Sequence, residues 1–293
     1  MPHQHISAIF APMQTAIKRI KSELEGLYPV TEIRSFSQLI IEKLTGFSRA
    51  EIIVNKNTQF SDKQYHEIET FLEKLKKFIP IQYILGETEF YGLTFSVNDS
   101  VLIPRPETEE LVDWIRTEND RNATLNILDI GTGSGCIAIS LKHEFQNSAV
   151  DAFDISDEAL ETARSNADRN QLEVNFSIVD ILNAPEFPKK WDIIVSNPPY
   201  VLENEKAEIL PNVLENEPHL ALFVPDNNPL IFYRSIAKFA MKQLKPNGKL
   251  YFEINRQYGK ATTELLSELG FIDIEMRKDI LGNDRMVTAV YSL

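Results

Sequence analysis

The sequence has little cysteine and histidine and contains no long apolar run. Its 293 residues include one cysteine and five histidines. A single cysteine cannot form an internal disulfide, and neither residue type shows the spacing of zinc ligands, so we expect neither a disulfide scaffold nor a metal site. No apolar run approaches the roughly 20 residues that span a bilayer, and the amino terminus lacks the features of a signal peptide. We therefore expect a cytoplasmic protein without a membrane partner.

Positive charge is scarce as well. The chain carries 30 Lys and Arg against 43 Asp and Glu, which gives a formal net charge of −13. Proteins that hold long nucleic acids need clustered Lys and Arg, so we expect no stable nucleic-acid binding. The remaining composition, 43% hydrophobic and 25% charged, is typical of a globular protein, and the length suits one large or two moderate domains.

The first 78 residues show the periodicity of amphipathic helices, because apolar residues recur every three or four positions. Ser61 followed by Gln64 predicts a capping box at the start of one of them. No catalytic group of residues is evident in this part of the chain. We interpret residues 1–78 as a small helical domain that serves substrate recognition or, alternatively, stability. Its predicted helices span residues 6–27, 35–44, 49–54 and 62–78.

Residues 79–100 are predicted to form a linker. Apolar and polar residues alternate from Gln82 to Val97, which indicates a β-hairpin that turns at Tyr91 and Gly92. Arg105 follows between two prolines, and an acidic first turn then opens a helix that runs to about Glu118.

The rest of the chain, residues 101–293, is predicted to have an α/β fold. Strands alternate with helices, which is typical of a Rossmann-like parallel sheet covered by helices on both faces. Residues 201–227 are mixed and acidic, and we expect them to form a mobile loop over the site. The expected strands are 125–130, 149–153, 173–179, 191–196, 249–254 and a closing hairpin of 271–276 with 286–292; the expected helices are 135–145, 157–170, 229–244 (with Asn228 as its cap) and 259–269.

The segment WDIIVSNPPY, residues 191–200, ends a buried strand at an amide, two prolines and an aromatic ring. The prolines cannot continue the strand, so the chain leaves the sheet at its carboxyl end, where open α/β sheets bind ligands. The side-chain oxygen of Asn197 and the carbonyl of Pro198 offer two acceptors to one NH2 group, and Tyr200 offers a flat face. This arrangement suits a planar substrate with an amino nitrogen; the alternative is a proline turn capped by Asn197.

A glycine-rich turn, LDIGTGSGCIAISL, joins another predicted strand to a helix. Asp129 ends the strand, and the glycines that follow let the backbone approach a ligand. Such a turn also fits a dinucleotide. Asp154 ends the next strand, where its carboxylate suits both hydroxyls of a ribose, in NAD as in other nucleotides. Asp180 and Ile181 follow the third strand and offer a polar group and an apolar surface to an adenine.

Together these motifs resemble class I S-adenosylmethionine-dependent methyltransferases that methylate a planar nitrogen. Within that class the chain is similar to the HemK/PrmC family, the glutamine N5-methyltransferases of peptide chain release factors. The likeness covers nearly everything after residue 80, whereas residues 1–78 match the family in architecture only. It rests on DIGTGSG, Asp154, the pair Val179 and Asp180, NPPY, YILGETEFYGLTF at 83–95, VLIPRPETEEL at 101–111 and RKDILGNDR at 277–285.

The resemblance implies a role for each of these motifs. The glycine turn would hold the methionine moiety of S-adenosylmethionine, Asp154 the ribose, and Asp180 with Ile181 the adenine region. The NPPY segment and Arg105 would receive the glutamine of a Gly-Gly-Gln loop, with Asn197, Pro198 and Tyr200 as the catalytic residues. We expect a monomer. The implied cofactor-binding residues are Asp129, Gly131, Thr132, Gly133, Ser134, Gly135, Asp154, Asp180, Ile181 and Asn197; the implied substrate-binding residues are Arg105, Asn197, Pro198, Pro199 and Tyr200.

Several alternatives stay open from the sequence. One is methylation of glutamine in a ribosomal protein, although the RPETEEL segment is more similar to the release-factor branch. Another is a DNA adenine-N6 methyltransferase, which also uses NPPY on a flipped base; the acidic charge weighs against it. A non-catalytic binding module or a dinucleotide-dependent oxidoreductase would share the glycine turn, and the nucleotide that co-purifies would distinguish these classes.

Overall fold

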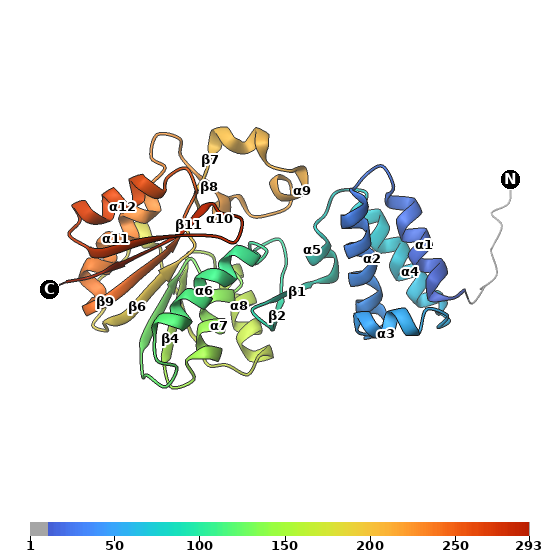
Figure 1. Ribbon diagram of the computed structural model, residues 1–293, viewed down its shortest axis with the longest axis horizontal. Coiled ribbons are helices and arrows are strands. Elements are labelled where there is room, and N and C mark those ends of the chain that lie inside the picture. The colour runs from blue at the N-terminus through green and yellow to red at the C-terminus, as the bar shows by residue number, and fades with distance from the viewer. Residues whose placement is uncertain (1–10, 293) are drawn as a thin grey trace. The chain divides into compact units, whose positions relative to one another are not determined.

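A seven-stranded sheet forms the centre of the second part of the chain in the computed structural model, which describes residues 11–292 (Figure 1). Its strands are β3 (Asn126–Ile130), β4 (Ala149–Asp154), β5 (Asn175–Ile178), β6 (Trp191–Ser196), β9 (Leu244–Glu253), β10 (Ile272–Lys278) and β11 (Asp284–Val290). They lie in the order β10-β11-β9-β6-β3-β4-β5. The five strands from β9 to β5 are parallel, and β11 pairs antiparallel with both β9 and β10. The expected α/β fold with a closing hairpin is confirmed.

Helices cover both faces of this sheet (Figure 1). Neighbouring residues of one strand enter different cores, because side chains alternate across a strand. Ile193 and Val195 of β6 pack in one core with α6 and α7, whereas Ile194 packs in the other with α11. The helices are α6 (Pro106–Glu118), α7 (Cys136–Glu144) and α8 (Asp157–Arg169) on one face, and α11 (Ile231–Gln243) and α12 (Gly259–Glu268) on the other.

The register of the parallel strands brings their carboxyl ends to one edge. Ile130 at the end of β3 pairs with Phe153 of β4 on one side and with Ser196 of β6 on the other. The loops that follow these strands therefore start side by side. The chain order reverses at β3, which is the switch point where open α/β sheets bind ligands.

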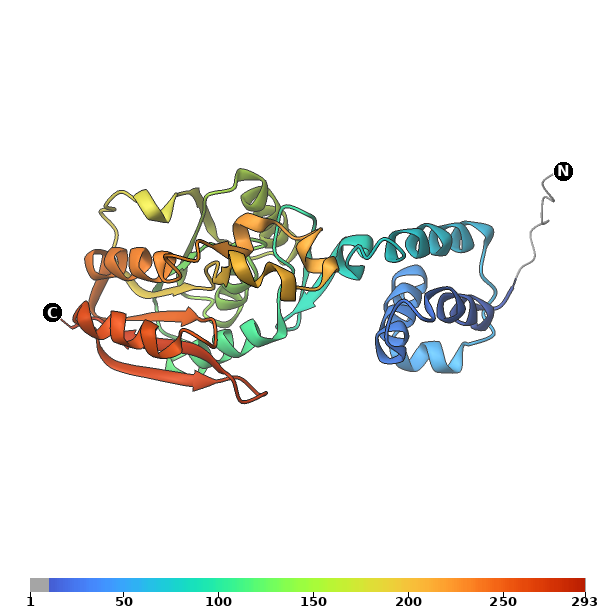
Figure 2. The same ribbon diagram turned by 90° about the horizontal axis from the view of Figure 1, so that it is seen from above.

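The described residues before position 87 form a helical unit. Its helices α1 and α2 contact each other, and α1 also contacts α4 (Figure 2). The predicted capping box is confirmed, because the Ser61 side chain accepts from the backbone of Gln64 and the Gln64 side chain accepts in return. The helices are α1 (Met13–Leu24), α2 (Val30–Thr45), α3 (Arg49–Val54), α4 (Asp62–Leu75) and α5 (Ile81–Leu85). The part of the predicted helix 6–27 before residue 11 lies outside the described residues.

The chain divides into two compact units between Gly86 and Glu87. We call the described residues 11–86 the helical unit and residues 87–292 the sheet unit. This division differs from the predicted segments 1–78, 79–100 and 101–293. The predicted linker is split, because the boundary after Gly86 falls within it. The short helix α5 precedes this boundary, with Pro80 as its N-cap and Gly86 as its C-cap in the left-handed conformation.

The predicted hairpin is present but shorter than expected, and it belongs to the sheet unit. It consists of β1 (Glu87–Phe90) and β2 (Leu93–Ser96), and both turn residues, Tyr91 and Gly92, have positive φ. Asn166 of α8 joins it to the sheet unit, since its side chain accepts from the Ser96 N–H at 2.6 Å and donates to the Ser96 carbonyl at 3.0 Å.

Residues 201–227, for which the sequence predicted only a loop, contain short elements. They are β7 (Val201–Leu202), the 3₁₀ helix η2 (Glu203–Glu208), α9 (Pro211–Leu214), α10 (His219–Leu222) and β8 (Phe223–Val224), with β7 and β8 paired in parallel. The next helix, α11, begins at Ile231 without a side-chain cap. The predicted cap at Asn228 is wrong, because the Asn228 side chain accepts from Arg234 at 3.3 Å instead.

Candidate active site

A cavity of about 420 Å³ lies at the carboxyl edge of the sheet, within the sheet unit. The loops after β3, β4, β5 and β6 line it, together with residues 100–108 and 218–221. Most of the residues that the sequence singled out meet here. Those that line the cavity are Arg105, Gly131, Thr132, Gly133, Ser134, Asp154, Asp180, Ile181, Asn197, Pro198 and Pro199.

The three glycines of the glycine-rich turn have different surroundings. Gly131 and Gly133 have φ of +73° and +54°, and open space lies where a β-carbon would point. Gly135 has a φ of +82°, but a β-carbon there would lie 2.9 Å from Ile139 and 3.1 Å from Ala163. The first two glycines therefore leave room for a ligand, whereas Gly135 allows α7 and α8 to pack closely.

Asp129 lies beneath the glycine-rich turn and does not line the cavity. Its Oδ2 accepts from the Thr132 hydroxyl at 2.6 Å and from the Ala138 N–H at 3.2 Å. Burial raises the pKa of Asp129 to about 7, because the charged form loses its hydration. Its position suits it to hold the turn in shape.

Asp154 lines the cavity from the end of β4. Its two oxygens accept from the Gly133 N–H at 2.8 Å and the Ser156 N–H at 3.0 Å. Burial raises the pKa of Asp154, while these backbone donors oppose the rise. Each oxygen retains capacity for a second donor, which suits hydroxyl groups of a ligand.

Ser134 adds an unpaired polar atom to the cavity wall. Its side chain is 2% exposed, and its hydroxyl has no hydrogen-bond partner among the described residues. Buried polar groups are normally paired, and this hydroxyl lies in the cavity wall, so it is available to a polar group of a ligand. Asp180 lies further along the wall and accepts from the Leu182 N–H at 2.9 Å, next to the apolar side chain of Ile181.

Asn197 follows β6 directly and lines the cavity together with Pro198. Its side-chain nitrogen donates to the hydroxyl of Thr108 at 3.2 Å. No hydrogen bond from residues 11–292 reaches its side-chain oxygen. That oxygen is therefore available to accept from a ligand.

Two predicted substrate residues are placed differently from the rest. Tyr200 is not among the residues that line the cavity; it is partly buried and packs against the core that contains α11. Its hydroxyl donates to Glu253 at 3.3 Å, and burial raises the pKa of Tyr200. Arg105 lines the cavity, but its guanidinium pairs with the buried carboxylate of Glu217 at 2.5 Å.

The sequence interpretation missed Thr108, Glu217 and Glu253. Glu253 ends β9, the neighbour of β6, directly after the apolar residues Leu250, Tyr251 and Phe252. Asp129 and Asp154 also follow apolar residues near the ends of their strands, so this pattern could have revealed Glu253. Thr108 was hidden among the acidic residues of a helix first turn. Glu217 lies 112 positions from its partner Arg105, and no local pattern connects them.

Comparison with known families identifies relatives over nearly the whole chain. Residues 108–220 match the family described as "Methyltransferase small domain", and residues 15–86 match the "PrmC N-terminal domain". The chain is 50% identical over 267 residues to a release factor glutamine methyltransferase of Flavobacterium psychrophilum, covering 90% of this chain and 94% of the relative. It is 47% identical to the protein of that name from Bacteroides thetaiotaomicron, covering 92% and 97%.

Solved structures support the fold. A methyltransferase from Pyrococcus furiosus superposes with a TM-score of 0.52 at 18% identity, covering 79% of this chain and 99% of that one. The match in fold, the two family matches and the high identity over nearly the whole chain agree with the resemblance read from the motifs. The chain belongs to the family of release factor glutamine methyltransferases.

Proposed function

We propose that this protein transfers a methyl group from S-adenosylmethionine to the side-chain amide nitrogen of the glutamine in the Gly-Gly-Gln motif of peptide chain release factors. One observation carries the proposal. A single cavity brings together a glycine-rich turn with Asp154 and an asparagine whose side-chain oxygen is available to accept. The glycine-rich turn with Asp154 suits a nucleoside cofactor, and the side-chain oxygen of Asn197 suits an NH2 group.

The residues around the glycine-rich turn fit S-adenosylmethionine. Asp154 would accept from the ribose hydroxyls, and the unpaired hydroxyl of Ser134 would contact a polar group of the amino-acid moiety. Gly131 and Gly133 leave open space for that moiety. Asp180 and Ile181 would line the adenine region. When bound, the cofactor supplies an electrophilic methyl group on a sulfonium centre.

Asn197 and Pro198 would act on the substrate amide. An amide nitrogen is a poor nucleophile because its lone pair is delocalised into the carbonyl. Hydrogen bonds from its NH2 group to the Asn197 oxygen and the Pro198 carbonyl would hold it in one orientation and favour the positive charge that develops on nitrogen. The amide proton becomes acidic only as this charge develops, so the chain needs no general base beforehand.

We further propose that the helical unit binds the partner protein, and that the protein acts as a cytoplasmic monomer without stable nucleic-acid binding. A second contact would raise the effective concentration of the glutamine loop at the cavity. Within residues 11–292, no helix is long and apolar enough to cross a membrane. The net charge of −13 disfavours binding to nucleic acid.

The test is incubation of the intact protein with labelled S-adenosylmethionine and an intact bacterial release factor, alongside duplex DNA and ribosomal proteins. We expect one methyl group on the glutamine of the Gly-Gly-Gln motif, located by peptide mass mapping. A short Gly-Gly-Gln peptide should react far more slowly than the whole factor. Label on adenine, or on a ribosomal protein in preference to the release factor, would overturn the assignment.

The role of Asp154 is tested separately by calorimetry. Asp154→Ala should weaken S-adenosylhomocysteine binding by about 1 to 3 kcal/mol, because charge-assisted hydrogen bonds are lost. NAD should not bind the unmodified protein. An unchanged affinity in the variant would remove Asp154 from the cofactor site.

A further inference from the structure

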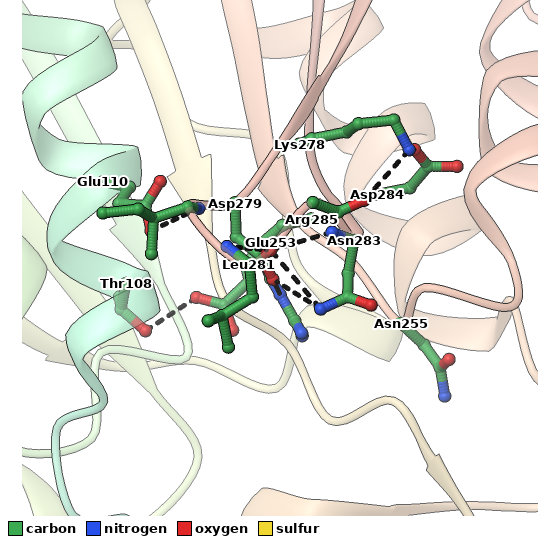
Figure 3. Close-up of polar contacts among 12 residues, drawn as sticks. Thr108, Glu110, Glu253, Asn255, Lys278, Asp279, Leu281, Asn283, Asp284 and Arg285 are labelled. Atoms are coloured by element: carbon green, nitrogen blue, oxygen red, sulfur yellow. Dashed lines mark hydrogen bonds and ion pairs between the residues drawn. The ribbon is translucent and has the colours of Figure 1, made fainter.

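Two consecutive hydrogen bonds hold the carboxamide of Asn197. Its nitrogen donates to the Thr108 hydroxyl at 3.2 Å, and that hydroxyl donates to Oε2 of Glu253 at 2.6 Å. Thr108 and Glu253 are 2% and 1% exposed, so water does not compete for these bonds. Figure 3 shows the Thr108 hydroxyl at the start of α6 directed at the carboxylate of Glu253.

The direction of these bonds fixes which end of the Asn197 amide faces the cavity. An ionised carboxylate can only accept, so the single proton of the Thr108 hydroxyl is committed to Glu253. The hydroxyl can then only accept from Asn197, which must present its NH2 group. If the amide were flipped, two acceptor oxygens would face each other and the hydrogen bond would be lost.

Three neighbouring groups favour the ionised form of Glu253, which accepts from Thr108. Burial raises the pKa of Glu253 and the charge of Glu107 adds to the rise, whereas the Thr108 hydroxyl, the charge of Arg285 and the Tyr200 hydroxyl oppose it. Arg285 is itself fixed, because its Nε donates to Asp279 at 3.1 Å.

Asp279 also shapes the turn between β10 and β11, because its carboxylate accepts hydrogen bonds from the backbone N–H groups of Leu281 and Asn283 (Figure 3). This turn belongs to the RKDILGNDR motif, for which the proposed reaction gave no role. The motif therefore connects to the site through Arg285 and Glu253.

We infer that Thr108 and Glu253 are positioning residues that make the site selective for an amide over a carboxylate on the substrate. The inference rests on the proposed function and deepens it. With its oxygen locked toward the cavity, Asn197 accepts a hydrogen bond from the NH2 group of glutamine. The carboxylate of a glutamate has no proton to give and would meet this oxygen as a second acceptor.

The test compares the unmodified protein with its Thr108→Val and Thr108→Ser variants. Each is assayed with two substrates: an intact bacterial release factor, and the same factor with glutamate in place of the glutamine of the Gly-Gly-Gln motif. Dissociation constants are measured with S-adenosylhomocysteine present, and methyl transfer is measured on the glutamine form. Thr262→Val is a matched control, because Thr262 is buried and its hydroxyl has no partner among the described residues.

We expect the unmodified protein to bind the glutamine form at least about 10-fold more tightly than the glutamate form, the effect of one well-placed hydrogen bond. Thr108→Val should bring this ratio close to one and slow transfer about 10-fold or more. Thr108→Ser, which restores the hydroxyl, should recover most of both losses. Thr262→Val should match the unmodified protein.

An unchanged affinity ratio in Thr108→Val, or a Thr108→Ser protein as impaired as Thr108→Val, would overturn the inference. Should Thr108→Val fail a thermal melt, Thr108→Ala carries the same expectation with a smaller side chain. A protein that transfers no methyl group, yet prefers the glutamine form in a manner that depends on Thr108, would refute the proposed function and leave the positioning role standing.

Discussion

The helical unit and the sheet unit differ most in the polar side chains that they bury. In the described part of the helical unit, Ser37 is the one buried polar side chain, and its hydroxyl bonds to the helix backbone at 2.7 Å. The sheet unit buries five carboxylates: Asp129, Asp151, Glu217, Glu253 and Asp279. Burying a charge is unfavourable unless it is paired or hydrogen-bonded, so each of these groups needs partners.

This difference shows where the chain places its chemistry. The core of the helical unit is apolar and serves packing, which leaves its outer surface for any role in recognition. Four of the five buried carboxylates of the sheet unit belong to the neighbourhood of the cavity: Asp129 under the glycine-rich turn, Glu217 with Arg105, and Glu253 linked through Arg285 to Asp279. Variants in the two units should therefore have different consequences.

The largest expected effect is a pH dependence that comes from Asp129 in the sheet unit. The pKa of Asp129 is about 7 in the folded protein against an ordinary value of 3.8. The folded state thus keeps a proton that the unfolded state releases, and the stabilisation is present below about pH 4 and lost as the pH rises to about 7. Relative to Asp129→Asn, the free energy of unfolding of the unmodified protein should fall by up to about 4 kcal/mol across this window.

Urea unfolding followed by tryptophan fluorescence measures this effect. Both tryptophans, Trp114 and Trp191, lie in the sheet unit, so the signal reports that unit. A stability difference between the two proteins that does not change with pH would contradict the assignment of the shift to Asp129.

Leu72→Ala tests the helical unit. Leu72 is 1% exposed, and its truncation should destabilise that unit by about 2 to 5 kcal/mol, because apolar contacts are lost and a cavity remains. Helical circular dichroism during urea unfolding measures the loss. Calorimetry should show unchanged affinity for S-adenosylhomocysteine; a large drop in that affinity would mean that the two units are energetically coupled.

Asn197→Ala should separate chemistry from cofactor binding in the sheet unit. We expect methyl transfer to the release factor to fall by at least about 100-fold, because a positioned acceptor acts mainly in the transition state. Cofactor affinity should stay nearly intact. Joint loss of both, with a lowered melting temperature in circular dichroism, would instead indicate structural damage.

The smallest effect contrasts one ion pair from each unit. Arg105→Ala leaves Glu217, whose side chain is 1% exposed, without its cation. The free energy of unfolding should fall by about 2 kcal/mol, which is less than for a fully buried pair because Arg105 is 33% exposed and water screens the interaction. Arg19→Ala breaks an ion pair with Glu69 in which both side chains are over 40% exposed, and it should cost less than about 1 kcal/mol. Equal losses in urea unfolding would refute the contrast.

Much of the fold could be predicted from local patterns. The strand at 191–196 and the helix at 49–54 were predicted with the bounds that the structure shows, because turn residues and caps mark their ends. The predicted ends of helices and strands were wrong where a residue that normally marks such an end has another role in the structure. Asn228 bonds to Arg234 instead of capping α11, and Gly86 ends a short helix within the predicted hairpin.

The sequence by itself determined the order of strands and helices, the glycine-rich turn and the NPPY segment, because these depend on neighbouring residues and on the limits that glycine and proline set for the backbone. Only the tertiary structure decided which side chains meet. Thr108, Asn197 and Glu253 lie far apart in the sequence, and Glu217 lies 112 positions from Arg105. Their contacts arise because parallel strands end at one edge of the sheet, and the pairing register that aligns these ends depends on the packing of the whole unit.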